Sequence, residues 1–270
     1  DELRYFIGDV RDQERLRMAM RGVDCVVHAA ALKHVPATEY NPFECIRTNV
    51  NGAENVVTAA IDSGVPRVVA LSTDKAVNPI NIYGASKLAA DKIFVAANML
   101  AGDEPTRFSV VRYGNVLGSR GSIVPLLRQF VAEGRKSLPL TDERMTRFWI
   151  TLDQGIDFVL SSADLMRGGE IFVPKVPSMK IADMMEVIAP GIPHNVIGVR
   201  PGEKLHEVLM SEDDTATVLD FGDRYAICPT HDARVQAYHE KNGATAIEQG
   251  FRYASDTNED WLDSKSLMAL

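Results

Sequence analysis

Short apolar runs alternate with amphipathic stretches through roughly the first 165 residues of the chain. The runs predict strands at residues 3–7, 25–30, 67–72 and 108–113. The stretches between and after them predict helices at residues 11–20, 42–63, 83–100, 125–133 and 153–164. Regular alternation of strand and helix is typical of a parallel sheet with helices on both faces. We therefore expect an α/β fold, a Rossmann-like doubly wound parallel sheet.

The pattern becomes irregular after about residue 169, where prolines interrupt it, among them Pro174, Pro177, Pro190, Pro193 and Pro201. This change predicts a main domain at residues 1–168 and a smaller, substrate-facing lobe with a C-terminal tail at residues 169–270. We expect the lobe to be interleaved with the main sheet.

The front of the chain lacks one expected motif. A dinucleotide-binding fold opens with a strand, a glycine-rich turn and a helix whose N-terminus holds the pyrophosphate. No such glycine spacing stands near Asp1. We therefore expect the first strands and the glycine-rich loop to lie upstream of residue 1, and an N-terminally incomplete sheet to fold poorly because its backbone groups lack partners.

Composition narrows the class of protein. The chain has 270 residues, 46% of them hydrophobic, which is enough for a full core, and a net charge of −8 without a basic block, which argues against a nucleic-acid partner. Three widely spaced cysteines indicate a reducing cytoplasm and neither a disulfide framework nor a zinc site. No apolar run in the part seen approaches the ~18 residues of a membrane span. His28 and His34 have no second ligand at useful spacing, so no metal is expected.

The candidate chemistry lies between residues 72 and 87, directly after the predicted strand 67–72. Tyr83 and Lys87 are four residues apart in a good helix sequence, so they share one helical face. An ammonium beside a phenol lowers the phenol's pKa and makes it a usable base, which suits removal of a hydroxyl proton while a hydride leaves for a nicotinamide. A Tyr-x-x-x-Lys pair alone is common by chance. Its position after a strand end, with Thr73, Asp74 and Lys75 beside it, favours an active site.

Several further segments carry a family resemblance. They are residues 29–36 (AAALKHVP), 39–44 (EYNPFE), 72–79 (STDKAVNP), 81–87 (NIYGASK), 112–116 (RYGNV), 118–122 (GSRGS), 145–150 (MTRFWI) and 200–207 (RPGEKLHE). With them the chain resembles the extended short-chain dehydrogenase/reductase superfamily over nearly its whole length. Within it the chain is most similar to the soluble, C5-inverting UDP-N-acetylglucosamine 4,6-dehydratases that begin pseudaminic acid synthesis for flagellin glycosylation. The membrane-anchored, configuration-retaining dehydratases generally carry methionine at the position of Tyr83.

The resemblance implies a lyase reaction in three parts: oxidation at C4, loss of water across C5 and C6, and return of the hydride to C6. Tyr83 would take the C4 hydroxyl proton, with Lys87 lowering its pKa and bonding the nicotinamide ribose. Thr73 would hydrogen-bond the C4 oxygen, and Asp74 would protonate the departing C6 hydroxyl. Lys75 would remove the C5 proton, which requires a neutral amine.

The resemblance favours NADP over NAD as cofactor. The residues it assigns to cofactor binding are Asp9, Val10, Ala29, Ala30, Lys33, Thr48, Ser72, Tyr83 and Lys87. For Thr48 and its neighbour Asn49, a buried hydrogen bond between helix and strand is an equally open alternative.

The implied substrate is a UDP-sugar, whose two phosphates need local positive charge. The residues assigned to it are Lys33, Asn115, Arg147, Arg200 and Glu203, with the two arginines at the diphosphate. The resemblance also implies a cytoplasmic homo-oligomer. Two other interpretations stay open. One is a nucleotide-sugar 4-epimerase, which needs the tyrosine–lysine pair but not Asp74 and Lys75. The other is a catalytically incomplete fragment or binding subunit.

Overall fold

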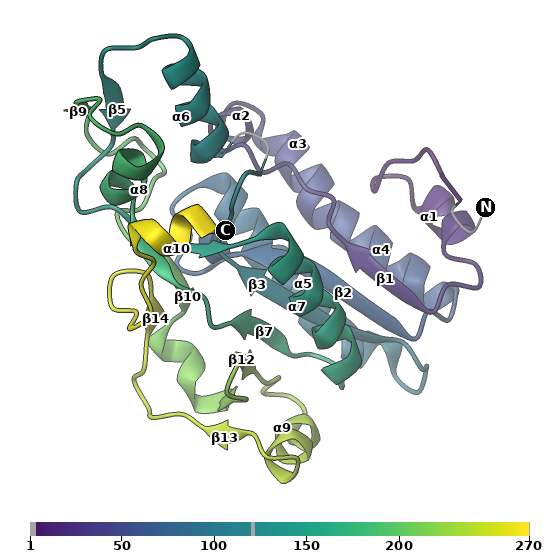
Figure 1. Ribbon diagram of the computed structural model, residues 1–270. Coiled ribbons are helices and arrows are strands. Elements are labelled where there is room, and N and C mark those ends of the chain that lie inside the picture. The colour runs from purple at the N-terminus through teal and green to yellow at the C-terminus, as the bar shows by residue number, and fades with distance from the viewer. Residues whose placement is uncertain (1–3, 120–121, 270) are drawn as a thin grey trace.

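A central seven-stranded sheet organises the computed structural model, which describes residues 4–119 and 122–269 (Figure 1). Its spatial order is β1 (Cys25–His28), β2 (Arg67–Thr73), β3 (Arg107–Tyr113), β7 (Ile171–Pro174), β12 (Arg224–Ile227), β11 (Val218–Asp220) and β13 (Thr245–Ala246). β1, β2, β3 and β7 pair in parallel, and the strands beyond β7 pair antiparallel. The predicted parallel α/β sheet is confirmed for β1, β2, β3 and β7.

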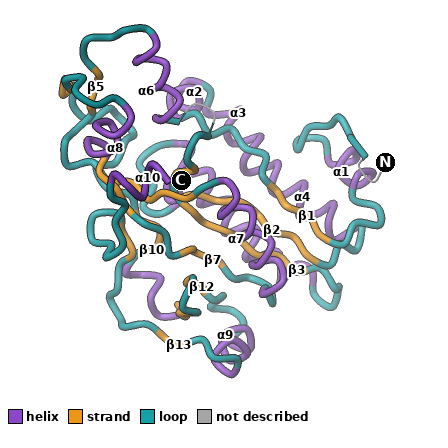
Figure 2. The backbone as a smooth tube through the Cα atoms, in the orientation of Figure 1, coloured by secondary structure: helices purple, strands orange, loops and turns teal. Residues whose placement is uncertain are grey.

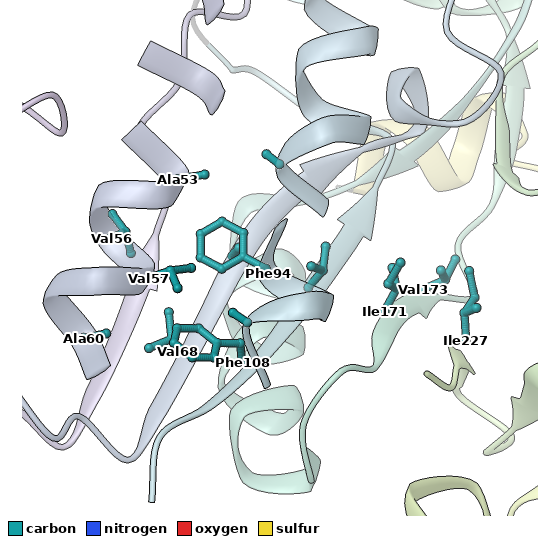
Figure 3. Close-up of a cluster of buried hydrophobic side chains, with 14 of the residues drawn as sticks. Ala53, Val56, Val57, Ala60, Val68, Phe94, Phe108, Ile171, Val173 and Ile227 are labelled. Atoms are coloured by element: carbon teal, nitrogen blue, oxygen red, sulfur yellow. The ribbon is translucent and has the colours of Figure 1, made fainter. Parts of the chain in front are cut away.

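Helices cover both faces of the parallel part. α4 (Gly52–Asp62) and α5 (Ile82–Ala101) pack on one face and α7 (Leu152–Leu165) on the other. Alternate strand residues point to opposite faces, so Val68 lies in the core under α4 and α5 whereas Val69 lies in the core under α7. Figure 3 shows Phe94 of α5 between the α4 side chains and Phe108 of β3.

The remaining elements form a lobe and several connections. A three-stranded sheet contains β4 (Asn115–Val116), β6 (Thr146–Ile150) and β8 (Ser178–Lys180), and two-stranded sheets contain β5 (Leu138–Leu140) with β9 (His194–Val196) and β10 (Val208–Met210) with β14 (Tyr253–Ala254). Figure 2 places β5 together with α6 (Ile123–Ala132) and α8 (Ile181–Ile188), which share a second hydrophobic core. The other helices are α1 (Gln13–Ala19), α2 (Val35–Tyr40), α3 (Pro42–Ile46), α9 (Ala233–Lys241), α10 (Ser264–Ala269), the π-helical turn η1 (Arg47–Asn51) and the 3₁₀ turns η2 (Asp74–Ala76) and η3 (Glu212–Thr217).

The strand predicted at residues 3–7 is absent from residues 4–7, so this prediction is wrong for them. Leu3 lies outside the described residues, and residues 4–7 form no strand. Tyr5 and Ile7 are 89% and 94% exposed. A strand is stabilised by pairing with a neighbour, and these residues have none in the described part of the chain. An apolar run predicts a strand only where a partner covers it.

The other sequence-predicted elements are present with small shifts of their ends. The helix expected at residues 42–63 is a continuous helical run of α3, η1 and α4, with a π-turn in the middle. The boundary after residue 168 stays a prediction. β7, β11, β12 and β13 all follow it in sequence and still extend the main sheet.

Within residues 4–119 and 122–269, no helix combines the length and apolarity that a bilayer crossing requires. The same part of the chain contains no cluster of three or more side chains suited to metal binding. Cys25, Cys45 and Cys228 are free thiols.

Candidate active site

A cavity of about 430 Å³ lies where β2 and β3 end, beside the loop that follows β1. Carboxyl ends of strands are the usual ligand-binding edge of an open α/β sheet. Predicted site residues from four separate parts of the chain line it: Ala29, Lys33, Ser72, Thr73, Lys75, Tyr83, Lys87 and Asn115. The structure therefore brings four of the five predicted catalytic residues, Thr73, Lys75, Tyr83 and Lys87, to one shared space.

Local hydrogen bonds shape the turn from β2 into α5. The Thr73 hydroxyl accepts from the Lys75 backbone N–H (3.3 Å) and so caps η2. Asn81 caps α5 by accepting from the Gly84 N–H (2.7 Å). Because α5 starts at this cap, Tyr83 and Lys87 fall in its first turns, facing the end of β2.

Gly84 is required where α5 crosses η2. A Cβ at this position would lie 2.3 Å from the Lys75 carbonyl oxygen, a backbone atom that cannot move aside alone. We expect Gly84→Ala to destabilise the protein by about 3 kcal/mol and to reduce activity, because relieving the overlap displaces Lys75 or Tyr83. Thermal or urea unfolding of the purified variant measures the effect.

Gly155 of α7 is the matched control for this prediction, since it is also helical but a Cβ added to it would have no atom within 4 Å. Gly155→Ala should stabilise the protein by about 0.5–1 kcal/mol through the helix preference of alanine. Equal stability of the Gly84→Ala and wild-type proteins would contradict the close approach.

Asp74 is fully buried and, unlike its neighbours Thr73 and Lys75, does not line the cavity. The Thr73 hydroxyl donates to its Oδ1 (2.9 Å), and Lys75 Nζ donates to the same oxygen (3.0 Å). Burial, followed by the nearby negative charge of Glu207, raises the pKa of Asp74. A raised pKa makes it easier for this carboxyl group to take up a proton, which an acid role requires.

Lys75 lies between two carboxylates. Its Nζ is 3.0 Å from Asp74 Oδ1 and 3.2 Å from Glu207 Oε1. Burial alone would lower the pKa of Lys75, but the two carboxylates outweigh it and raise that pKa. The expectation of an amine already made neutral by its surroundings is therefore not met, and a base role requires the proton to leave Lys75 first.

The expected electrostatic pairing of Tyr83 and Lys87 is also different. Burial raises the pKa of Tyr83 to about 12, and the cation that opposes this rise is Lys75. Lys87 Nζ donates to the Leu71 carbonyl oxygen (2.7 Å), and burial lowers the pKa of Lys87. Helical spacing placed both side chains at the cavity correctly, but it gave no information about which ammonium faces the phenol.

The predicted cofactor residues divide into two groups. Ala29, Lys33 and Ser72 line the cavity with Tyr83 and Lys87. The Ser72 hydroxyl is buried without a hydrogen-bond partner among the described residues, as is the side-chain oxygen of the cavity-lining Asn115. Unpaired buried polar atoms beside a cavity are costly unless a ligand bonds them. The two unpaired atoms fit a ligand with hydrogen-bonding groups, such as a dinucleotide.

The remaining predicted cofactor residues lie outside this lining. The Asp9 carboxylate is paired with Arg11, whose hydrogen bonds hold the pKa of Asp9 at about 2, and Val10 packs against Gly52 of α4. Ala30 is exposed beyond Ala29.

Thr48 lies half-buried in the π-turn, whereas its neighbour Asn49 is buried. The Asn49 side chain accepts from the Leu32 N–H (2.8 Å) and donates to the Leu32 carbonyl oxygen (3.0 Å). Of the two roles left open for Asn49, the structure thus shows a buried hydrogen bond. This bond holds the loop after β1 against the π-turn.

Arg147 has structural partners that compete with the predicted diphosphate contact. Its guanidinium donates to the carbonyl oxygens of Thr146 (2.6 Å), Leu205 (3.1 Å) and Lys204 (3.0 Å). Its Nε lies 3.6 Å from Glu207 Oε1. The apolar setting in the sequence indicated burial correctly. These contacts brace the chain at residues 204–207, and the diphosphate role of Arg147 stays a prediction.

Arg200 and Glu203 form an ion pair with each other and do not line the cavity. Arg200 is exposed. One carboxylate oxygen of Glu203 is buried without a partner among the described residues. Both belong to the segment of residues 200–207, which packs on the loop before Tyr83 through a hydrogen bond from Asn81 Nδ2 to the Gly202 carbonyl oxygen (2.8 Å).

Some residues at the site were not predicted from the sequence. His34, Tyr113, Ser119 and Ser122 line the cavity, and Glu207 contacts Lys75 from outside that lining. The 200–207 segment was recognised as a motif, but nothing in its spacing connects Glu207 to a lysine so far away in sequence. Only the fold shows that contact.

The parallel sheet, the flanking helices and the tyrosine–lysine helix at the strand ends define a Rossmann-type fold of the short-chain dehydrogenase/reductase kind. The chain belongs to the family described as polysaccharide biosynthesis protein, whose model matches residues 1–229.

Two enzymes of known name are similar in sequence to this chain. A UDP-N-acetylglucosamine 4,6-dehydratase (inverting) from Campylobacter jejuni is 55% identical over 98% of this chain and 81% of its own length. A UDP-glucose 4-epimerase from Rickettsia canadensis is 44% identical over 84% of this chain and 67% of its own length.

Solved structures agree on the fold. Pen from Bacillus thuringiensis superposes with a TM-score of 0.87 at 36% identity, covering 98% of this chain and 79% of Pen. DesIV, a dTDP-glucose 4,6-dehydratase from Streptomyces venezuelae with NAD and TYD bound, superposes with a TM-score of 0.69 at 25% identity, covering 89% of this chain and 80% of DesIV.

Proposed function

We propose that this protein is an inverting UDP-N-acetylglucosamine 4,6-dehydratase, which converts its substrate to a UDP-4-keto-6-deoxy-hexose. The observation that carries the proposal is one cavity bordered by Thr73, Lys75 and Tyr83, with the Asp74 carboxyl hydrogen-bonded to the first two. The 55% identity to a Campylobacter jejuni enzyme of that name supports it.

Each side chain has one task in the proposed reaction. A nicotinamide cofactor, when bound, supplies the hydride acceptor and donor. Tyr83 takes the proton of the C4 hydroxyl, and Thr73 bonds the C4 oxygen. The ketone at C4 acidifies the C5 proton, which Lys75 removes, while Asp74 protonates the departing C6 hydroxyl. Return of the hydride to C6 and addition of a solvent-derived proton at C5 would complete the 4-keto-6-deoxy sugar.

Lys75 and Asp74 reach their reactive forms by exchanging a proton. Their bonded atoms, Nζ and Oδ1, are 3.0 Å apart. Transfer of one proton from the ammonium to the carboxylate produces a neutral amine and a carboxylic acid without changing the net charge of the pair. The raised pKa of Asp74, caused by burial and Glu207, favours this transfer, and the raised pKa of Lys75 opposes it.

The finer assignments are part of the same proposal. Family resemblance favours NADP, whereas DesIV is described with NAD. We further propose a cytoplasmic homo-oligomer, with dimers built on helices that flank the active site, whose product feeds pseudaminic acid synthesis for flagellin glycosylation. We propose the catalytic, cofactor and substrate roles that the resemblance implies for individual residues, and a domain boundary after residue 168.

Incubation of the full-length protein with UDP-N-acetylglucosamine and either NADP or NAD tests the activity. We expect a product lighter by one water in mass spectrometry, with no net consumption of cofactor. Unchanged substrate at saturating concentrations of both cofactors would exclude the dehydratase.

A second candidate is a nucleotide-sugar 4-epimerase, favoured by the 44% identity to Rickettsia proteins of that name. An epimerase would yield a product of unchanged mass, so the same experiment separates the two. Lys75 at the cavity and Asp74 bonded to it favour the dehydratase, because epimerisation at C4 needs neither.

A further inference from the structure

We propose that Glu207 is the positioning residue for Lys75: its carboxylate fixes the amine at the wall of the cavity, where it reaches the C5 proton. Glu207 lies just before β10, is 2% exposed and has Oε1 3.2 Å from Lys75 Nζ. This role rests on the proposed dehydratase function and belongs to a residue for which the sequence alone indicated none.

The backbone of Glu207 is held from both sides. Its N–H donates to the Ser255 hydroxyl (2.9 Å), and the Ser255 N–H donates to the Glu207 carbonyl oxygen (2.8 Å). The Ser255 hydroxyl also hydrogen-bonds the Thr146 hydroxyl on β6 (2.7 Å). The carboxylate therefore extends from a fixed point toward Lys75.

Two further cations keep this carboxylate ionised. Arg147 Nε lies 3.6 Å from Oε1, and Lys204 Nζ lies 3.9 Å from Oε2. Burial opposes ionisation, but Lys75, Arg147 and Lys204 together lower the pKa of Glu207. Oε2 has no hydrogen-bond partner among the described residues. A fully bonded structural carboxylate would satisfy both oxygens, so this group acts mainly through its charge.

The proposed chemistry explains why a second carboxylate is useful. Asp74 must give its proton to the departing hydroxyl, so its charge changes during the reaction. Glu207 takes no part in that transfer and keeps its position and its charge. A lysine side chain has four flexible methylene carbons. With a single carboxylate partner, its ammonium would move when that partner changes its charge.

The segment that carries Glu207 is also fastened to the catalytic loop. Lys204 Nζ donates to the Val77 carbonyl oxygen (2.5 Å), and Asn81 Nδ2 donates to that of Gly202 (2.8 Å). Val77 and Asn81 lie between Lys75 and Tyr83 in sequence. These contacts set the distance between Glu207 and Lys75.

Glu207→Gln in the full-length protein tests the proposal. We expect elimination of water to slow by at least about 100-fold while oxidation at C4 continues, so that reduced cofactor accumulates during turnover. KM for the UDP-sugar should change little. A variant that eliminates water at the wild-type rate overturns the proposal.

The pH profile separates positioning from simple structural support. Glu207 raises the pKa values of both Asp74 and Lys75, so its neutralisation should move both limbs of the rate profile to lower pH. The charged and titratable groups that face this cluster are Asp74, Lys75, Tyr83, Arg147, Lys204 and Glu207. A lower rate with an unshifted profile, and with oxidation slowed equally, would assign Glu207 a structural role only.

Two further variants complete the design. Glu207→Asp keeps the negative charge but moves it one methylene away from Lys75. Elimination should slow in this variant, while both limbs of the pH profile stay at their wild-type positions. If Glu207→Gln does not fold, a wild-type ratio of elimination to oxidation in Glu207→Asp overturns the proposal. Glu170→Gln is the matched control, an equally buried carboxylate bonded to His239 and outside the cavity lining, and should lower stability without changing that ratio. If the wild-type protein forms no dehydrated product, the proposed function fails, independently of these comparisons.

Discussion

Replacing Asp74 with asparagine is expected to slow formation of the dehydrated product by about 1,000-fold while oxidation at C4 remains measurable. Asparagine preserves the shape of this fully buried side chain and can still bond Thr73 and Lys75. It has no acidic proton to give to the C6 hydroxyl, so the reaction should stop at the 4-keto sugar. Rapid-quench analysis of the sugar, with the absorbance of reduced cofactor followed in parallel, measures both steps.

Asp91→Asn provides the comparison for this variant. Asp91 is as buried as Asp74, but its carboxylate pairs with Arg112 at 3.2 Å and it is not part of the cavity lining. Loss of that buried pair should lower thermal stability, and the 4-keto intermediate should still lose water. An Asp74→Asn protein that dehydrates at the wild-type rate would remove Asp74 from the mechanism.

Replacing Tyr83 with phenylalanine is expected to reduce oxidation and elimination together by about 1,000-fold, because elimination depends on the C4 ketone. Tyr83 is 8% exposed, and that exposure faces the cavity that Thr73 and Lys75 also line. Since burial raises its pKa to about 12, the wild-type oxidation rate should increase with pH across the neutral range as more phenolate forms. Single-turnover absorbance of reduced cofactor measures this step directly.

Tyr225→Phe controls for the loss of a hydroxyl. Tyr225 lies on β12, outside the cavity lining, and packs against Tyr253 and Phe251. Its variant should oxidise the substrate at the wild-type rate. A Tyr83→Phe protein with comparable activity would exclude the phenol as the base at C4.

The arrangement of residues 72–87 was predictable because it is local. A buried strand, a short polar turn and a helix follow one another without interruption, and each has its own sequence pattern. Once β2 and α5 form, Thr73, Lys75 and Tyr83 have little freedom in where they point. The same reasoning predicted the helix at residues 83–100 to within one residue at each end.

Contacts across the fold were not predictable in this way. Arg147 also bonds the carbonyl oxygens of residues 204–205, contacts that the sequence did not indicate. Lys75 was expected to be neutral, but Glu207 approaches it from a segment with no local relation to η2. Sequence patterns give each residue's chemistry and local geometry, whereas pKa values depend on every charge that the tertiary structure brings near.

The antiparallel extension of the main sheet had no clear signal either. β11, β12 and β13 are short, and they follow a region where prolines and glycines obscure any periodicity. They join the sheet because β12 pairs with β7 along the edge that the parallel strands leave open. Propensity alone does not reveal such an edge.

Turnover in heavy water is the sharpest test of an acid and a base acting together beside Tyr83. We expect the full-length protein to convert UDP-N-acetylglucosamine to a 4-keto-6-deoxy sugar with one solvent deuterium at C5 and the opposite configuration there, as read by NMR. A product that retains its C6 hydroxyl, or one with the original C5 hydrogen, would contradict this mechanism.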